Sequence, residues 1–182
     1  MGKLIIFGIL SLLSIIFSWR TLFILKSHGF YRFFSWECII WLFASNYTFW
    51  FNDPFSVKQI FSWIFLLLSA YLVIIGAILL IKKGKPLNIR DDKTLFQFEK
   101  TTSLIDTGIY KYIRHPIYSS LIYLTWGIYL KNTTFELLIV AVLSSIFLYI
   151  TAKLDEKECI LYFKDEYKSY INRSKMFIPF LF

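Results

Sequence analysis

Five long apolar blocks, separated by short polar or charged stretches, dominate the pattern of the chain. They cover Leu4–Leu25, Phe33–Phe51, Ile60–Ile81, Ile117–Leu130 and Phe135–Ala152. Since a helix needs about 20 apolar residues to cross a bilayer, the blocks predict five membrane spans, the fourth of them short. We therefore expect an all-α integral membrane protein.

Composition and the placement of charge support this class. Hydrophobic residue types make up 57% of the 182 residues, which exceeds the share in soluble domains. With the N-terminus outside, 16 of the 20 Lys and Arg residues fall in inner segments, as expected for cytoplasmic loops. The net charge of +8 then faces anionic lipid headgroups rather than nucleic acid. We expect a multi-pass protein with a cytoplasmic C-terminus, and the short loops favour a prokaryotic inner membrane.

The chain has no internal repeat and no low-complexity linker, so we expect one membrane domain over residues 1–182. Residues 1–81 are predicted to form a three-helix part. Residues 82–182 would hold a cytoplasmic loop, a helical hairpin and an amphipathic C-terminal helix. Cys38 falls in a span and Cys159 on the cytoplasmic side, so no disulfide is expected. There is no Cys/His cluster with zinc spacing, and no metal is expected.

Arg114, His115 and Pro116 stand immediately before the fourth apolar block. Its 14 residues, Ile117–Leu130, reach roughly 21 Å as a helix, against a hydrocarbon core of about 30 Å. The charged groups at its start are therefore expected below the headgroups, where such groups usually face a cavity or a partner. Pro116 suits the first turn of a helix, whose backbone donors favour an anionic ligand group. Alternatively, Arg114 and His115 are interfacial anchors.

The segment "LDEKECILYFKDEYKSYI" is predicted to be an amphipathic helix. At about 100° per residue, its apolar residues gather within roughly 60° of Glu156, whereas the other charged residues lie farther round. Glu156 is thus the acid on the apolar face. A carboxylate there needs a partner, and the candidates are Arg114 and a bound cation.

Three segments together resemble the isoprenylcysteine carboxyl methyltransferase family, membrane enzymes related to phospholipid methyltransferases. They are "LIDTGIYKYIRHPIY", "DEKECILYFKDEYKSY" and "MFIP", in the order and spacing of that family, and the resemblance covers Leu104–Pro179. It implies a membrane-embedded methyltransferase that encloses S-adenosylmethionine and modifies a lipophilic or prenylated acceptor. Residues 1–103 match only as helices.

The resemblance also implies which residues contact the cofactor. The family pattern favours Asp155 as the acidic contact, whereas the helix phase favours Glu156, and both stay open. The implied cofactor contacts are Ser103, Leu104, Ile105, Tyr110, His115, Pro116, Ile117, Tyr118, Asp155 and Glu156.

Arg114 and Glu156 are the candidate catalytic residues. Arg114 would orient an anionic acceptor or pair with the acids, and a carboxylate near the sulfonium would help binding more than rate. The family carries a substrate-holding arginine four residues before the first acid, where this chain has Thr151. Lys153 or Arg114 would have to replace that arginine as the anchor of a carboxylate acceptor.

Further departures from the family concern single positions. Asp155 replaces a usual glutamate, Cys159 a usual leucine, and Lys164 stands where glycine commonly follows the phenylalanine. The acceptor stays open among prenylcysteine carboxylates, phospholipid amines, small thiols and other lipids. Two further alternatives are a sterol-reductase-like enzyme that binds NADPH and a non-catalytic helical membrane protein.

Overall fold

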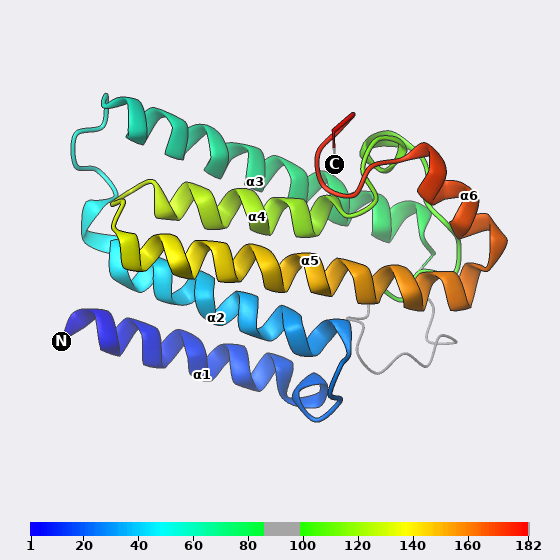
Figure 1. Cartoon of the computed structure of the whole chain (residues 1–182), viewed down its shortest axis with the longest axis horizontal. Coiled ribbons are helices and arrows are strands. Elements are labelled where there is room, and N and C mark those ends of the chain that lie inside the picture. The colour runs from blue at the N-terminus through cyan, green and yellow to red at the C-terminus, as the bar shows by residue number, and fades with distance from the viewer. Residues whose placement is uncertain (86–98, 182) are drawn as a thin grey trace.

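The computed structural model describes residues 1–85 and 99–181 as a bundle of helices that lie side by side (Figure 1). The described residues contain no β-strand, only an isolated parallel bridge between Ile113 and Lys175. The α-helices are α1 Gly2–Leu22, α2 His28–Asn46, α3 Val57–Lys83, α4 Pro116–Tyr129, α5 Phe135–Phe163 and α6 Asp165–Arg173, and the 3-10 helices are η1 Tyr47–Phe49 and η3 Gly108–Lys111.

Hydroxyl side chains define where three of the long helices begin. Ser27 accepts a hydrogen bond from the backbone N–H of residue 30 at the start of α2, Ser56 caps α3 in the same way, and Thr134 caps α5. Such caps satisfy a backbone donor that the first helical turn leaves without a partner. Pro116 is the first residue of α4, where its missing N–H costs no hydrogen bond.

Polar contacts join the helices in the middle of the bundle. α2 packs on α5, α4 contacts both of them, and α3 and α1 flank this group on opposite sides (Figure 1). The Ser144 hydroxyl of α5 lies 2.9 Å from that of Ser35 in α2 and 3.1 Å from that of Thr125 in α4. Within an apolar bundle, such hydrogen bonds between helices fix how the helices lie against one another.

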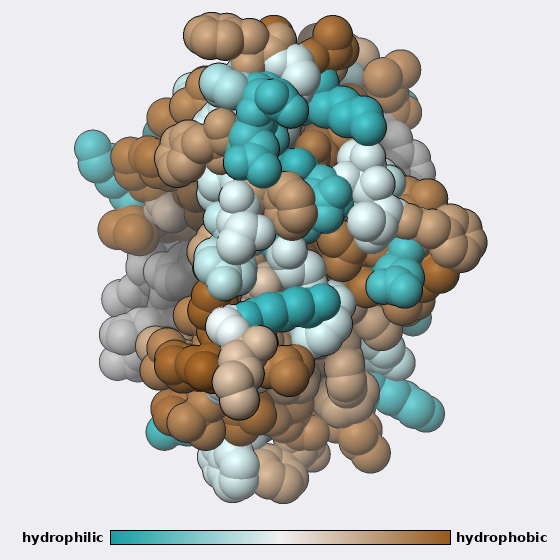
Figure 2. All heavy atoms as spheres, turned by 90° about the vertical axis from the view of Figure 1, so that its left-hand side faces the viewer, coloured by the Kyte–Doolittle hydropathy of each residue, from teal (hydrophilic) through white to brown (hydrophobic). Residues whose placement is uncertain are grey.

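A buried lysine closes the end of the bundle at which the N-terminus lies. The ammonium of Lys131 lies 3.7 Å from the ring centroid of Trp63 and 5.2 Å from that of Trp50, and it donates to the Gln59 side chain at 2.9 Å. Figure 2 views this end, where hydrophilic residues gather over the middle and hydrophobic residues surround them. This contact joins η1, α3 and the turn before α5.

Within residues 1–85 and 99–181, three helices are long and apolar enough to cross a membrane: α1, α3 and α5. Large apolar side chains on their outer faces are exposed, as expected for surfaces that contact lipid. The prediction of an all-helical membrane protein is confirmed. α2, with 19 residues, and α4, with 14, lie beside these helices, and the count of five spans stays a prediction. In the predicted loop 82–116, residues 86–98, with Arg90 and Lys93, lie outside the described residues.

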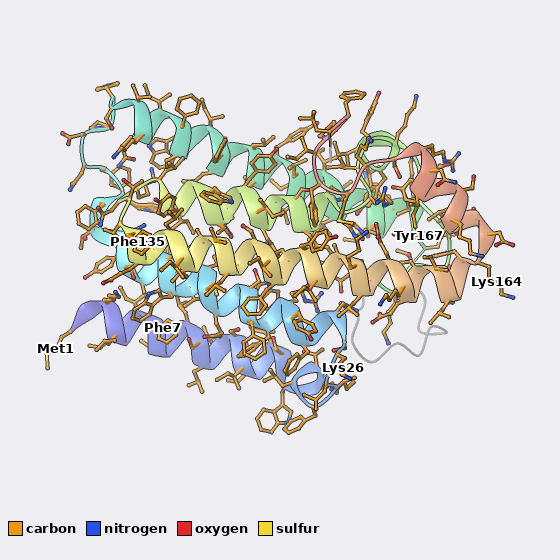
Figure 3. All side chains as sticks on the ribbon, in the orientation of Figure 1. Met1, Phe7, Lys26, Phe135, Lys164 and Tyr167 are labelled. Carbon is orange, nitrogen blue, oxygen red and sulfur yellow. The ribbon has the colours of Figure 1, made fainter. Side chains whose placement is uncertain are left out.

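The predicted C-terminal helix is divided in two. α5 continues without interruption through the charged segment to Phe163, and α6 begins at Asp165. Between them, Lys164 has φ 53° and ψ −126°, a backbone conformation that glycine adopts without strain and lysine does not. The break redirects α6 across the end of the bundle. Lys164 and Tyr167 lie at this end, and Met1 lies at the other (Figure 3).

The break predicts that Lys164→Gly stabilises the protein. Glycine adopts the backbone conformation at position 164 without strain, so this substitution should raise the free energy of unfolding by about 1 kcal/mol. As a matched control, Lys168→Gly within α6 should lower it by about 1 kcal/mol, because glycine destabilises a helix interior. The measurement is chemical unfolding in detergent micelles, and a destabilised Lys164→Gly variant would contradict the prediction.

Candidate active site

The C-terminal segment pairs with the residues that precede α4. The backbone N–H of Arg114 donates to the Lys175 carbonyl at 2.8 Å, that of His115 donates to Met176 at 3.2 Å, and that of Lys175 donates to Tyr112 at 2.9 Å. Two backbone donors just before α4 are therefore taken by the protein itself. This pairing fixes the Arg114 and His115 side chains against α5.

Arg114 forms a buried ion pair with Glu156 of α5. Its Nη2 lies 2.7 Å and its Nε 2.8 Å from Glu156 Oε1, and only 7% and 6% of the two side chains are exposed. Its Nη1 donates to the Ser174 carbonyl at 2.5 Å. Arg114 is thus buried inside the protein, unlike an interfacial anchor, and it joins three segments. Lys153 also donates to Glu156, at 3.1 Å.

His115 lies between the two neighbouring acids of α5. Its Nδ1 is 3.4 Å from Asp155 Oδ2, and its Nε2 is 3.6 Å from Glu156 Oε1. Burial by itself lowers the pKa of the imidazole, but the two carboxylates outweigh this effect and raise its pKa above the ordinary value. The ring lies within ion-pair distance of both carboxylates.

A cavity opens beside these charged groups, between α3, the segment before α4, α5 and α6. It has a volume of about 100 Å³. Nine of the predicted site residues line it: Leu104, Ile105, Tyr110, Arg114, His115, Pro116, Ile117, Tyr118 and Asp155.

The other predicted site residues do not line the cavity. Glu156 lies behind the wall, where it holds Arg114 and Lys153. Thr151 is fully buried, and its hydroxyl donates to the carbonyl of Phe147 at 2.7 Å. Ser103 lies next to the lining residue Leu104 without lining the cavity itself. Of the two adjacent acids, Asp155 is the one that faces the cavity.

Sequence reasoning missed part of the lining. The added lining residues come from α3, from the segment 99–115, from α5 and from α6: Leu80, Glu99, Thr101, Cys159, Phe163, Tyr167 and Tyr170. Tyr167 and Tyr170 belong to the apolar face of the predicted helix, but side chains in a core and side chains in a cavity wall follow the same helical spacing. Glu99 carries no motif that could have identified it.

The cavity combines two carboxylates, those of Glu99 and Asp155, with several aromatic rings. Tyr118 stacks on His115 with ring centroids 5.4 Å apart, and the Tyr170 hydroxyl donates to the Tyr110 carbonyl at 2.5 Å. The Nε2 atom of His115 is buried and has no hydrogen-bond partner. An acid among aromatic side chains suits a ligand that has a cationic centre and a flat aromatic group.

Near this cavity, His28, Asp155 and Glu158 place metal-binding atoms within 4.8 Å of one another. The His28 Nδ1 atom lies 2.8 Å from Glu158 Oε2, so a hydrogen bond accounts for this grouping. The expectation that no metal binds stays a prediction.

The fold and the cavity thus define an all-helical membrane protein with a charged, aromatic ligand site at one end of its bundle. The sequence model of the phospholipid methyltransferase family matches residues 63–162, more than half of the chain. The chain belongs to this family. The match includes Arg114, His115 and both acids, but not α1 or α2.

One curated relative adds to this assignment. Methanethiol S-methyltransferase 1 of Bradyrhizobium diazoefficiens is 35% identical over 71 residues, which are 39% of this chain and 24% of the relative. The chain therefore matches about a quarter of the length of that relative. The comparison with solved structures gives no significant match.

The Arg114–Glu156 pair predicts a large loss of stability in Glu156→Gln. Removing the charge leaves a buried guanidinium without its counter-ion, which should lower the free energy of unfolding by about 3 to 5 kcal/mol. The exposed Arg173–Asp106 pair, at 2.7 Å, offers a matched control: Asp106→Asn should cost less than about 1 kcal/mol. Equal losses in the two variants, measured by unfolding in detergent, would contradict the prediction.

Proposed function

We propose that the protein transfers a methyl group from S-adenosylmethionine to a lipophilic acceptor. The observation that carries the proposal is the Asp155 carboxylate in the wall of an aromatic cavity, on residues that resemble a family of such enzymes. S-adenosylmethionine has a cationic centre and a flat adenine ring, which are the two groups that this wall suits. When bound, it supplies an electrophilic methyl group.

The residues of the chain would bind and align the reactants. Methyl transfer is an in-line displacement, so alignment and exclusion of water provide most of the rate gain. Asp155 would attract the cationic part of the cofactor, and Tyr110 and Tyr118 would shape the pocket together with His115. Because the positive charge disperses during transfer, Asp155 should contribute to binding more than to rate. Arg114 and Glu156 would keep His115 and the segment before α4 in place.

A second, apolar groove supports a lipophilic acceptor. It holds about 570 Å³ between α3, α4 and α5. Its Ser145 hydroxyl accepts from the Trp126 indole and donates to the Ala141 carbonyl, so these polar groups are already paired and the groove suits hydrocarbon. The groove and the cavity lie next to each other at the start of α4, where Tyr118 lines the cavity and the next residue, Ser119, lines the groove.

The site offers less support for a carboxylate acceptor. The cations that were to replace the family arginine, Arg114 and Lys153, both contact Glu156, and Thr151 lies outside the cavity. A neutral or thiol acceptor fits this arrangement better. The name of the curated relative, methanethiol S-methyltransferase, favours a small thiol as the second candidate.

The test is equilibrium binding of S-adenosylhomocysteine to the full chain in detergent, with NADPH as the competing ligand. We expect S-adenosylhomocysteine to bind and NADPH not to bind. Asp155→Asn should weaken binding of S-adenosylmethionine, which carries the sulfonium charge that S-adenosylhomocysteine lacks, at least about tenfold, or about 1.4 kcal/mol. As a matched control, Asp165→Asn removes an acid that is 91% exposed and should leave affinity unchanged.

Two results would overturn the proposal. One is a folded wild-type protein that does not bind S-adenosylhomocysteine. The other is an Asp155→Asn variant that binds S-adenosylmethionine as tightly as the Asp165→Asn control.

A further inference from the structure

One face of α2 carries two ionisable side chains toward the cavity. His28 and Arg32 are one helical turn apart, and both are buried, with 0% and 4% of each residue exposed. Both residues lie outside the segment 63–162 that matches the phospholipid methyltransferase family. Burying an ionisable group near a membrane is costly unless the group has a partner, and such groups usually belong to functional sites.

The local sequence fixes where His28 lies. Ser27 accepts a hydrogen bond from the backbone N–H of Phe30 at 3.1 Å, which sets the start of α2 at His28. At Gly29, an added Cβ would lie 2.8 Å from the Thr21 side chain of α1. The end of α1 therefore packs closely on this first turn and holds it in place.

His28 contacts the acidic turn of α5. Its Nδ1 lies 2.8 Å from Glu158 Oε2, and atoms of His28, Asp155 and Glu158 all lie within 4.8 Å of one another. Because Asp155 and Glu158 are three residues apart, they share a face of α5. His28 thus lies beside the acid that faces the cavity.

Arg32 makes a parallel contact one turn further along α2. Its Nη1 lies 3.0 Å from both carboxylate oxygens of Glu99, and Glu99 lines the cavity. The same face of α2 therefore reaches two acids of the cavity wall, independently of each other.

We propose that His28 is a positioning residue that holds the Asp155 carboxylate in the cavity wall. This role rests on the proposed binding of S-adenosylmethionine at Asp155. Glu158 fixes the orientation of the His28 ring through Nδ1, and the ring borders Asp155 on the side of α2. His115 borders the same carboxylate from the other side, 3.4 Å away. Two imidazoles thus lie beside the carboxylate, 3.4 Å from it in the case of His115 and within 4.8 Å in the case of His28, and such support preorganises a binding site.

The test compares His28→Leu with His28→Asn by binding of S-adenosylmethionine to the full chain in detergent. Leucine fills the space of the ring without a polar atom, whereas the asparagine amide can donate to Glu158 from the position of Nδ1. His28→Leu should weaken binding about tenfold and His28→Asn less than about threefold. A role in packing alone would give the reverse order.

A matched control separates this effect from loss of packing. Ser35→Ala removes a buried hydrogen bond between the same two helices, 2.9 Å long, away from the acids, and should leave affinity unchanged. If His28→Leu does not fold, His28→Gln takes its place in the test. The glutamine amide lies at the position of Nε2 rather than Nδ1, so it also loses the contact with Glu158. The same loss of about tenfold is expected.

A double variant shows whether His28 acts through Asp155. With Asp155→Asn already present, His28→Leu should change affinity less than about twofold, since the carboxylate that it positions is absent. A full tenfold loss in that background, or His28→Leu binding as tightly as Ser35→Ala, would overturn the His28 proposal alone. Wild-type protein that does not bind S-adenosylhomocysteine would instead overturn the proposed function.

Discussion

The buried ion pair between Arg114 and Glu156 is the contact on which the cavity depends. Arg114 bonds Glu156 at 2.7 Å and also donates to the Ser174 carbonyl, so it joins the segment before α4, the end of α5 and the C-terminal segment. Two charges removed from water are stable only when such contacts are complete. The three segments must therefore come together in one arrangement, and that arrangement forms the wall of the cavity.

The same principle extends along the last turns of α5. Each acid near the cavity meets a basic side chain from another part of the chain: Glu156 meets Arg114, Asp155 meets His115, Glu158 meets His28 and Glu99 meets Arg32. α2 and the segment before α4 therefore both pack against the acidic turn of α5 through ion pairs. Among these acids, Asp155 combines the looser contact, 3.4 Å, with a place in the cavity wall. It is the carboxylate best placed to interact with a ligand.

Much of the fold could be predicted because its causes are local. Each apolar block overlaps one of the helices α1 to α5, and Pro116 begins α4 as its backbone chemistry predicts. The break at Lys164 could be located only in part: glycine is usual there in the family, but the chain has lysine, whose strained φ of 53° the sequence does not reveal.

The candidate site could be predicted only where one segment carries it. The residues from Leu104 to Tyr118 follow one another in the chain, and most of them line the cavity. The choice between Asp155 and Glu156 could not be made from helix phase, because neighbouring residues point about 100° apart and both of these acids are largely covered by protein. The contribution of α2 depends on a contact between residues 130 apart, His28 and Glu158. No local pattern reports such a contact.

The central claim is that the cavity beside Asp155 holds S-adenosylmethionine. Its most direct test is ultraviolet crosslinking of S-adenosylmethionine with a labelled methyl group to the purified protein, followed by peptide mapping. We expect the label on Tyr110, Tyr118 or Tyr167 themselves, assigned by sequencing the labelled peptides, because these side chains line the cavity whereas Ser119 lines the groove. We expect excess S-adenosylhomocysteine to suppress it. Label that maps to α1 or to the α3–α4–α5 groove, or that resists competition, would contradict the account.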